Sequence, residues 1–195
     1  HGWIPEAKLV FKSARKTGDY HGQMNHDLFS KWFREQLLPH IPKHSLIVMD
    51  NASYHNALAS HSAPTATCKK DDIRSWLIKN RIPVRDDSLK VELIEILEKL
   101  APAPTYALDE LAREQGHEIL RTPPYHPELQ PIETCWAVVK NQIARNSKFT
   151  MTHLLKQLDN AFERVTPETC SGLIQKVRGV EDKYWREDVR SDRWL

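Results

Sequence analysis

An apolar run that ends in a carboxylate constrains the fold of this chain more than any other feature. The stretch SLIVMDNASYH places four apolar residues, Leu46 to Met49, directly before Asp50. A short, fully apolar run is typical of a strand that is covered on both faces, as in the sheets of α/β proteins. Open α/β sheets bind their ligands at the carboxyl ends of such strands, so Asp50 is the first candidate functional residue.

The composition fits an ordinary globular chain of 195 residues and says little about partners. The 28 basic and 26 acidic residues nearly cancel, so bulk charge does not identify a nucleic-acid-binding protein. The apolar runs are too short for a membrane-spanning helix, and no membrane association is expected. Three widely spaced cysteines give neither a disulfide framework nor a CxxC metal-binding motif.

The order of the predicted elements is typical of an α/β domain with a helical insertion. A strand over residues 8–13 and a helix with Asn25 as its N-cap precede the apolar strand, and another strand follows at 117–121. The charged, helical stretch between the last two strands, at about 56–115, is interpreted as an insertion. Further helices end the chain, and we interpret about 150–195 as a C-terminal helical extension.

A second carboxylate, Glu133, falls in the first turn of a long amphipathic helix. The segment PPYHPELQPIETCWAVVKNQIARN puts Pro131 at the first helical position, where its missing N–H is not needed. Glu133 lies beside the predicted buried stripe, so its backbone is held near the core while its side chain extends past the edge of the core, as a metal ligand requires. The residues of that stripe are Ile132, Trp136, Val139 and Ile143.

An aspartate at a strand end and a glutamate on a helix laid over the sheet can share a hard divalent cation. Mg²⁺ prefers oxygen ligands and commonly takes only one or two carboxylates from the protein. Such ions activate a water or a 3′-hydroxyl and stabilise the leaving oxygen of a phosphodiester. The alternative is local: Asp50 forms a turn, and Glu133 stabilises the helix N-terminus through the helix dipole. Spacing alone does not decide between these interpretations.

Two motifs, IVMDNASYH and LRTPPYHPELQPIETCWAVVKNQIAR, closely resemble the catalytic core of Tc1/mariner-like transposases, which are DDE superfamily endonucleases. The segments GDYHGQMN and FSKWFREQLLPHIP are similar to the same group, so the resemblance covers nearly the whole chain. It implies a ribonuclease H-like fold, as in retroviral integrases, with Asp50 and Glu133 as the second and third catalytic carboxylates and metal ligands. It also implies Mg²⁺- or Mn²⁺-dependent cutting and joining of transposon ends and target DNA, in the nucleus.

The chain departs from the family pattern at three points. The first catalytic aspartate belongs on a strand before residues 8–13, and no aspartate precedes Lys8. We therefore expect residues 1–195 to be a partial DDE endonuclease domain whose first strand lies outside this chain. The separation of Asp50 and Glu133 exceeds the compact mariner spacing because of the insertion. Gln130 stands where asparagine is usual before PIE, and glutamine caps a helix less well.

Other polar residues near the two carboxylates are candidate DNA contacts. They are Asn51, His55, His126, Lys140 and Arg145. His126 precedes the Glu133 helix and is a candidate to face the scissile phosphate, whereas Lys140 and Arg145 follow Glu133 and suit phosphate contacts leading out of the site. Four of these residues have an ordinary structural alternative: backbone hydrogen bonding for Asn51 and His126, and solvated surface for Lys140 and Arg145.

Three functions are compatible with the sequence. The first is the catalytic part of a transposase, expected to be a homodimer because it joins two DNA ends and to need the first strand for cleavage. The second is a catalytically inactive or domesticated relic that binds DNA or protein, which the near-neutral charge and the absent first carboxylate favour. The third is a different ribonuclease H-like nuclease that acts on RNA–DNA hybrids, which the fold alone does not exclude.

Overall fold

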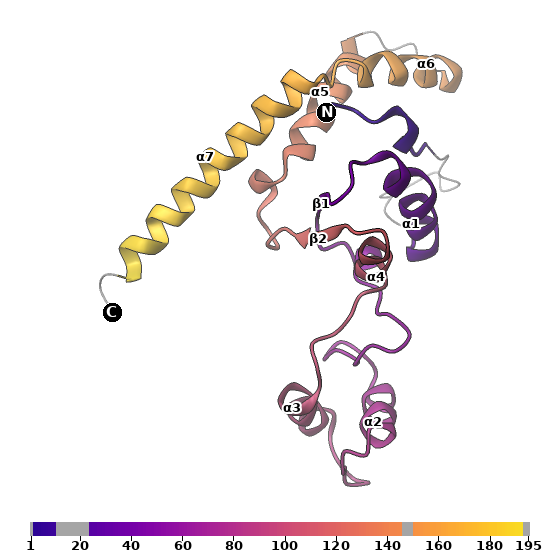
Figure 1. Ribbon diagram of the computed structural model, residues 1–195, viewed down its shortest axis with the longest axis vertical. Coiled ribbons are helices and arrows are strands. Elements are labelled where there is room, and N and C mark those ends of the chain that lie inside the picture. Colours follow the sequence, from indigo (N-terminus) through magenta and orange to yellow (C-terminus); the bar gives the residue numbers. More distant parts are fainter. Residues whose placement is uncertain (1, 11–23, 146–149, 193–195) are drawn as a thin grey trace. The chain divides into compact units, whose positions relative to one another are not determined.

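The structure is a mixed α/β chain in which helices predominate (Figure 1). It is a computed structural model that describes residues 2–10, 24–145 and 150–192. The strands are β1 (Leu46–Met49) and β2 (Glu118–Arg121). The helices are α1 (His26–Trp32), α2 (Lys70–Lys79), α3 (Lys90–Leu100), α4 (Ala107–Glu114), α5 (Pro131–Arg145), α6 (Met151–Phe162) and α7 (Pro167–Asp192). Across these described ranges, no helix combines the length and the apolar character needed to cross a membrane.

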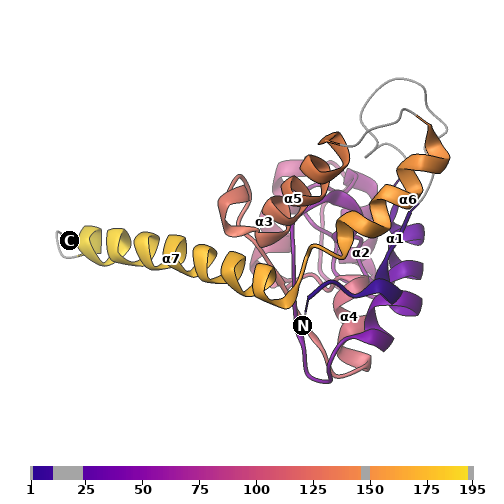
Figure 2. The same ribbon diagram turned by 90° about the horizontal axis from the view of Figure 1, so that it is seen from above.

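The chain divides into two compact units. Unit 1 comprises His1–Lys12, Val48–Asn51 and Leu120–Leu195, and unit 2 comprises Ser13–Ile47 and Ala52–Ile119. Within unit 1, α5 packs against both α6 and α7, and α7 continues as one long helix past the ends of the other two (Figure 2). Helices α2, α3 and α4 belong to unit 2.

β1 and β2 form a two-stranded parallel sheet. The Glu118 N–H donates to the Ser45 carbonyl at 3.0 Å and the Thr122 N–H to the Met49 carbonyl at 2.9 Å, so both strands advance in the same direction. Their carboxyl ends therefore meet at one edge of the sheet. This α/β arrangement and the strand expected from the apolar run are confirmed.

The expectation that β1 is covered on both faces is wrong. Leu46 and Val48 are 56% and 52% exposed, whereas Ile47 and Met49 are half-buried. Side chains alternate between the two faces of a strand, and the described residues cover only one face of this sheet. Leu120 of β2 is likewise exposed.

The strand expected over residues 8–13 is not formed where the structure describes it. Residues 8–10 are outside any strand, and residues 11–13 lie outside the described ranges. Contacts with α6 and the turn that follows it hold this segment instead of strand pairing. Trp3 stacks on Phe162 with ring centroids 4.0 Å apart, its N–H donates to the Val165 carbonyl, and Lys8 forms an ion pair with Asp159.

Two helices of unit 2 begin and end as their sequences predict. The Asn25 side chain accepts the Leu28 N–H at 2.9 Å, which caps α1, and helical turns continue to His40. α4 ends at Gly116, whose φ of 78° is left-handed. The Gly116 N–H donates to the Arg113 carbonyl and the following N–H to the Ala112 carbonyl, which is the hydrogen-bond pattern of a Schellman motif.

α2 and α3 form a helical pair with a core of its own. Ile73 and Leu77 of α2 pack against Leu93 and Leu97 of α3, and all four are buried. α2 ends in the same motif as α4, but the left-handed position is occupied by Arg81, with φ of 61°. A side chain in this conformation costs about 1–2 kcal/mol relative to a right-handed one, because Cβ approaches the following carbonyl oxygen.

Glycine and alanine at position 81 should therefore give proteins of different stability. We expect Arg81→Gly to be more stable than Arg81→Ala by about 1 kcal/mol, because both remove the side chain but only glycine adopts a positive φ freely. Urea unfolding of the two variants measures the difference. Equal stabilities would contradict the left-handed assignment at Arg81.

Candidate active site

The carboxyl ends of β1 and β2 form the base of the candidate active site in unit 1. Asp50 follows β1 directly and is exposed to solvent. The next residue, Asn51, donates from its side-chain Nδ2 to the Thr122 carbonyl at 2.6 Å. Thr122 is buried, and its hydroxyl lies 3.5 Å from the Met49 carbonyl, to which it donates. These contacts fix the two strand ends, and with them the backbone that carries Asp50.

Gln130 connects this edge of the sheet to the first turn of α5. Its side-chain Nε2 donates to the Thr122 hydroxyl at 3.0 Å. Its carbonyl accepts the Glu133 N–H at 3.2 Å. Glutamine caps a helix less well than the asparagine that is usual at this position. In the structure the Gln130 side chain instead ties that turn to the end of β2.

The buried stripe of α5 is only partly the predicted one. Val139 is buried against α6 and the turn after it, and Ile143 packs at the edge of the same cluster, as expected. Ile132 and Trp136, which were also predicted to be buried, are 53% and 42% exposed. The reason is the direction from which α6 and α7 pack, which brings the partly buried Cys135 against this cluster instead.

The exposed side of α5 carries the polar candidates. Glu133 lies in the first turn, and Lys140 lies two turns further along on nearly the same side of the helix. Arg145 is the last residue of α5 and is also exposed. The helix therefore presents one carboxylate at its N-terminus and two cations further along, where phosphates can reach them.

His126 belongs to a cluster of three polar residues. Its ring Nδ1 lies 2.8 Å from Oε1 of Glu128, in the turn η6 (Pro127–Leu129). The Tyr184 hydroxyl, from α7, donates to the same carboxylate oxygen at 2.6 Å and lies 3.4 Å from His126 Nδ1. The two rings meet edge to face, with centroids 5.5 Å apart. The segment before Glu133 is thus joined to the long C-terminal helix.

The hydrogen bonds of this cluster lower the pKa of Glu128. The hydrogen bond from Tyr184, followed by that from His126, lowers the pKa of Glu128 from 4.5 to about 2. The same contact raises the pKa of Tyr184, because ionising the phenol would remove the proton that Glu128 accepts. Glu128 is therefore a carboxylate at neutral pH and accepts hydrogen bonds from both neighbours.

His55 lies in the core of unit 2. Its side chain is 7% exposed and packs against the rings of Phe29 and Tyr54, with centroids 4.3 and 4.5 Å away. This packing leaves little of the imidazole surface available to a DNA phosphate. We therefore assign His55 a packing role and do not retain it as a candidate DNA contact.

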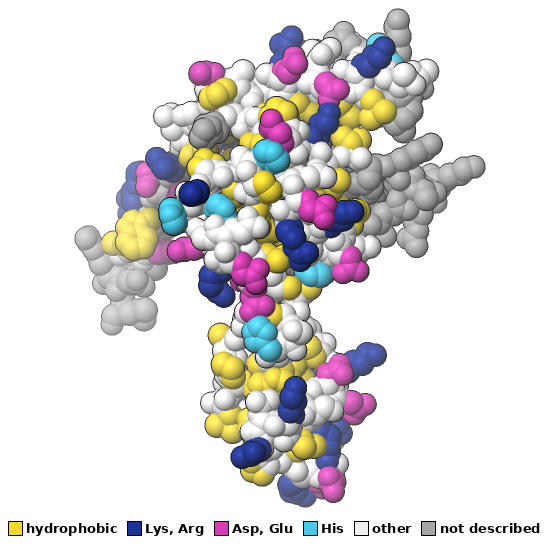
Figure 3. Space-filling model, turned by 45° about the vertical axis from the view of Figure 1, so that its right-hand side comes forward, with side chains coloured by type: hydrophobic (Ala, Val, Ile, Leu, Met, Phe, Trp, Pro, Cys, Tyr) yellow, Lys and Arg dark blue, Asp and Glu magenta, His cyan; other side chains and the backbone are white. Residues whose placement is uncertain are grey.

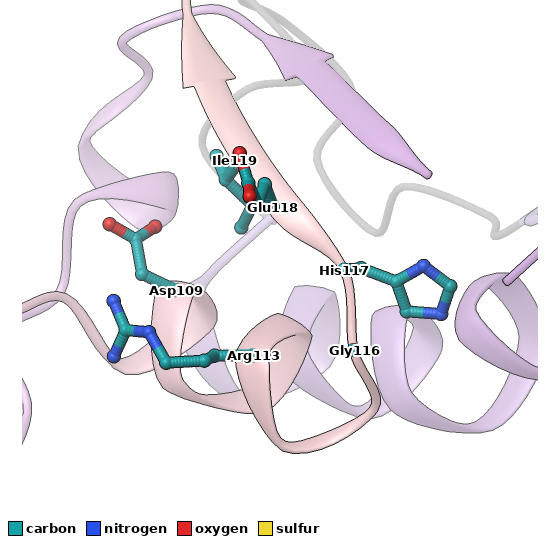
Figure 4. Close-up of a pocket in the computed structure, with 6 residues that line it drawn as sticks. All are labelled: Asp109, Arg113, Gly116, His117, Glu118 and Ile119. Carbon is teal, nitrogen blue, oxygen red and sulfur yellow. The ribbon is translucent and has the colours of Figure 1, made fainter. Parts of the chain in front are cut away.

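A polar pocket of about 550 Å³ lies in unit 2, at the junction of α4 and β2 (Figure 4). Its lining residues are Asp109, Arg113, Gly116, His117, Glu118 and Ile119. His117 is buried, and its Nδ1 accepts the Ser45 N–H at 3.2 Å, which helps to hold the start of the sheet. None of the residues predicted to act on DNA lines this pocket.

The donor chemistry of Asp50 and Glu133 fits a hard divalent cation. Both are exposed carboxylates of unit 1, on backbone that Thr122 and Gln130 connect. Within the described ranges, no group of three or more His, Cys, Asp and Glu side chains is arranged to hold a metal ion. Asp50 and Glu133 carry oxygen donors of the kind that Mg²⁺ prefers, and Mg²⁺ commonly takes only one or two carboxylates from a protein.

Three residues of the site were not singled out from the sequence. Thr122 follows β2 as Asp50 follows β1, so its place beside the site follows once the two strands are known to be parallel. Glu128 lies inside the recognised PPYHPELQPIE motif, but no feature of the neighbouring sequence indicated that it has a functional role. Tyr184 is separated from His126 by 58 residues, and no sequence signal connects them.

These features define a class of protein: an α/β domain with one carboxylate at the end of a sheet strand and another on a helix that a later strand leads into. The family of DDE superfamily endonucleases matches residues 12–156, which include both carboxylates. This match covers roughly three quarters of the chain, and the chain therefore belongs to the DDE superfamily endonucleases. It has no significant match among curated proteins and none among solved structures.

The hydrogen bond between Thr122 and Gln130 should appear as an energetic coupling. We expect Thr122→Val to lower the free energy of unfolding by about 1–2 kcal/mol, because it removes a hydroxyl that both donates and accepts. Gln130→Met should cost about 1 kcal/mol, and the double variant should cost less than the sum of the two by about that amount. Urea unfolding of the four proteins measures the coupling.

Gln142→Met, on the same helix, serves as the control. Its effect on the free energy of unfolding should simply add to that of Thr122→Val, because the Gln142 and Thr122 side chains share no hydrogen bond. Additivity of Thr122→Val with Gln130→Met would contradict the connection between β2 and α5.

The low pKa of Glu128 predicts a pH-dependent contribution to stability. A carboxylate whose pKa is 4.5 in the unfolded chain and about 2 in the folded one stabilises the fold fully above pH 4.5. This contribution is lost as the pH falls toward 2. We therefore expect Glu128→Gln to melt below the wild type at pH 6, and the difference to shrink between pH 4.5 and pH 2. A difference in melting temperature that stays constant over this range would contradict the assignment.

Proposed function

We propose that this chain is the catalytic core of a Tc1/mariner-like DNA transposase with a ribonuclease H-like fold. It cuts and joins phosphodiester bonds at transposon ends with Mg²⁺ or Mn²⁺. The observation that carries the proposal is the run of hydrogen bonds from Asn51 through Thr122 to Gln130, which couples the strand end bearing Asp50 to the helical turn bearing Glu133. Membership of the DDE superfamily endonucleases supports the same reaction class.

In this proposal Asp50 and Glu133 hold the metal ion. The ion would activate the attacking water or 3′-hydroxyl and stabilise the leaving oxygen. The chain's own contribution is to hold the backbone that carries both carboxylates in place before DNA arrives, so that less reorganisation is needed when it binds. Asn51 was considered as a DNA contact, but its amide bonds to the Thr122 carbonyl, and we assign it the positioning of Asp50.

DNA binding in this proposal depends on the positions of individual basic side chains. Basic and acidic side chains are interspersed on the face that Figure 3 shows, in keeping with a net charge of +2. Lys140 and Arg145 are exposed on the helix that begins with Glu133 and suit backbone phosphates, which position DNA without reading its sequence. Because transposition joins two ends, we further propose that the protein acts as a homodimer, in the nucleus.

Metal binding at the two carboxylates is testable without DNA. An ion that binds only the folded state stabilises it by about 1.4 kcal/mol when its concentration is ten times the dissociation constant. We expect Mn²⁺ to raise the melting temperature of the wild type, and Asp50→Asn and Glu133→Gln each to remove most of that rise. Glu95→Gln, an exposed position on α3, is the matched control and should keep it.

Cleavage of DNA in the full-length natural protein tests the rest of the proposal. Asp50→Asn and Glu133→Gln should each reduce Mn²⁺-dependent cleavage of a duplex with the element ends to background, whereas Glu95→Gln should not. Metal binding without any cleavage would identify an inactive relic. Cleavage confined to the RNA strand of RNA–DNA hybrids would identify a nuclease of another kind, and cleavage that survives in Asp50→Asn would contradict the role of Asp50.

A further inference from the structure

The long helix α7 reaches the segment that leads into Glu133 through one side chain. Tyr184 lies more than four turns along α7, half-buried against η6. Its hydroxyl donates to Oε1 of Glu128 at 2.6 Å, and the same oxygen lies 2.8 Å from Nδ1 of His126. Glu128 is thus shared between a residue of α7 and the histidine that begins the turn before α5.

The shared carboxylate determines which ring nitrogen of His126 carries the proton. An ionised carboxylate only accepts hydrogen bonds, so both of its neighbours must donate to it. The tyrosine gives its O–H, and the histidine must therefore give Nδ1–H. The tautomer of a histidine is set in this way by the partner of one nitrogen, and the other nitrogen, Nε2, is left for a ligand. The His126 side chain is 41% exposed, so a ligand from solvent can reach the ring.

We propose that Tyr184 is a positioning residue for His126: acting through Glu128, it holds the Nδ1–H of the imidazole toward the carboxylate, so that the Nε2–H of the doubly protonated ring donates to a backbone phosphate of bound DNA. Nε2 donates to a phosphate oxygen when the ring carries both protons. The proposal rests on the proposed function only in that the phosphate belongs to DNA. It extends the site from the sheet and α5 to α7, and it places no metal ion in the contact.

Nuclear magnetic resonance of the imidazole nitrogens tests the first step. In the wild type above the titration range of the ring, His126 should show a protonated Nδ1 and a bare Nε2. Tyr184→Phe removes only the hydroxyl, and Glu128→Gln replaces the shared acceptor; both should move the ring toward a mixture of tautomers. An Nε2–H tautomer in the wild type, or no change in Tyr184→Phe, would overturn the positioning role.

A double-mutant cycle on DNA affinity tests the second step. Binding of a fluorescently labelled duplex is measured by anisotropy at fixed salt and without divalent cations, so that the metal site does not enter. We expect Tyr184→Phe to weaken binding about 2- to 5-fold and His126→Ala about 5- to 10-fold, the range of one ordinary hydrogen bond. In the His126→Ala background, Tyr184→Phe should have no further effect.

The outcomes separate this inference from the metal-dependent function. An equal loss from Tyr184→Phe in both backgrounds would mean that Tyr184 acts through helix packing, which overturns the proposal. A wild type that binds no duplex would overturn the phosphate contact. The tautomer measured by nuclear magnetic resonance would still decide whether Tyr184 positions His126. If Mn²⁺ fails to bind but the cycle shows coupling, the proposed metal site is wrong and the role of Tyr184 stands.

Discussion

A buried hydroxyl must find partners for both its proton and its lone pairs, and Thr122 finds them on two different segments of the chain. It donates to the carbonyl of Met49 at the end of β1 and accepts from Gln130 before α5. Its backbone carbonyl also accepts from Asn51. Leaving such a group without partners inside a protein costs about 1–3 kcal/mol, so the three segments are held to one arrangement. The proposed reaction depends on that arrangement, since the carboxylates of Asp50 and Glu133 are attached to two of them.

The parts of this molecule that local sequence controls were predictable. The apolar run before Asp50 is a strand, Asn25 caps a helix, Pro131 begins one and Gly116 ends one. Each of these depends on a residue's own conformational preference or on bonds to near neighbours in the chain. The family could be recognised for a related reason, because its two central motifs are continuous stretches of sequence.

What the sequence did not reveal depends on contacts between distant segments. The burial of Trp136 was predicted from a helical stripe, but the side from which α6 and α7 pack decides which residues of α5 are covered. His55 looked like a DNA contact because it follows Asp50, yet its ring lies in the core of unit 2. The hydrogen bond of Tyr184 crosses 56 residues, and no periodicity or motif reports such a contact.

The parallel direction of β1 and β2 bears on how the long connection between them can vary. Parallel strands cannot be joined by a tight turn, so a crossover segment is required, and here α2, α3 and α4 belong to it. For a flexible connection, the entropy lost on closing it grows only logarithmically, by about 0.6 kcal/mol for each doubling of length. α2 and α3 also bury their own core, which offsets part of what the extra residues lose on folding. Such a crossover can gain or lose whole helices while the residues at the strand ends stay in register.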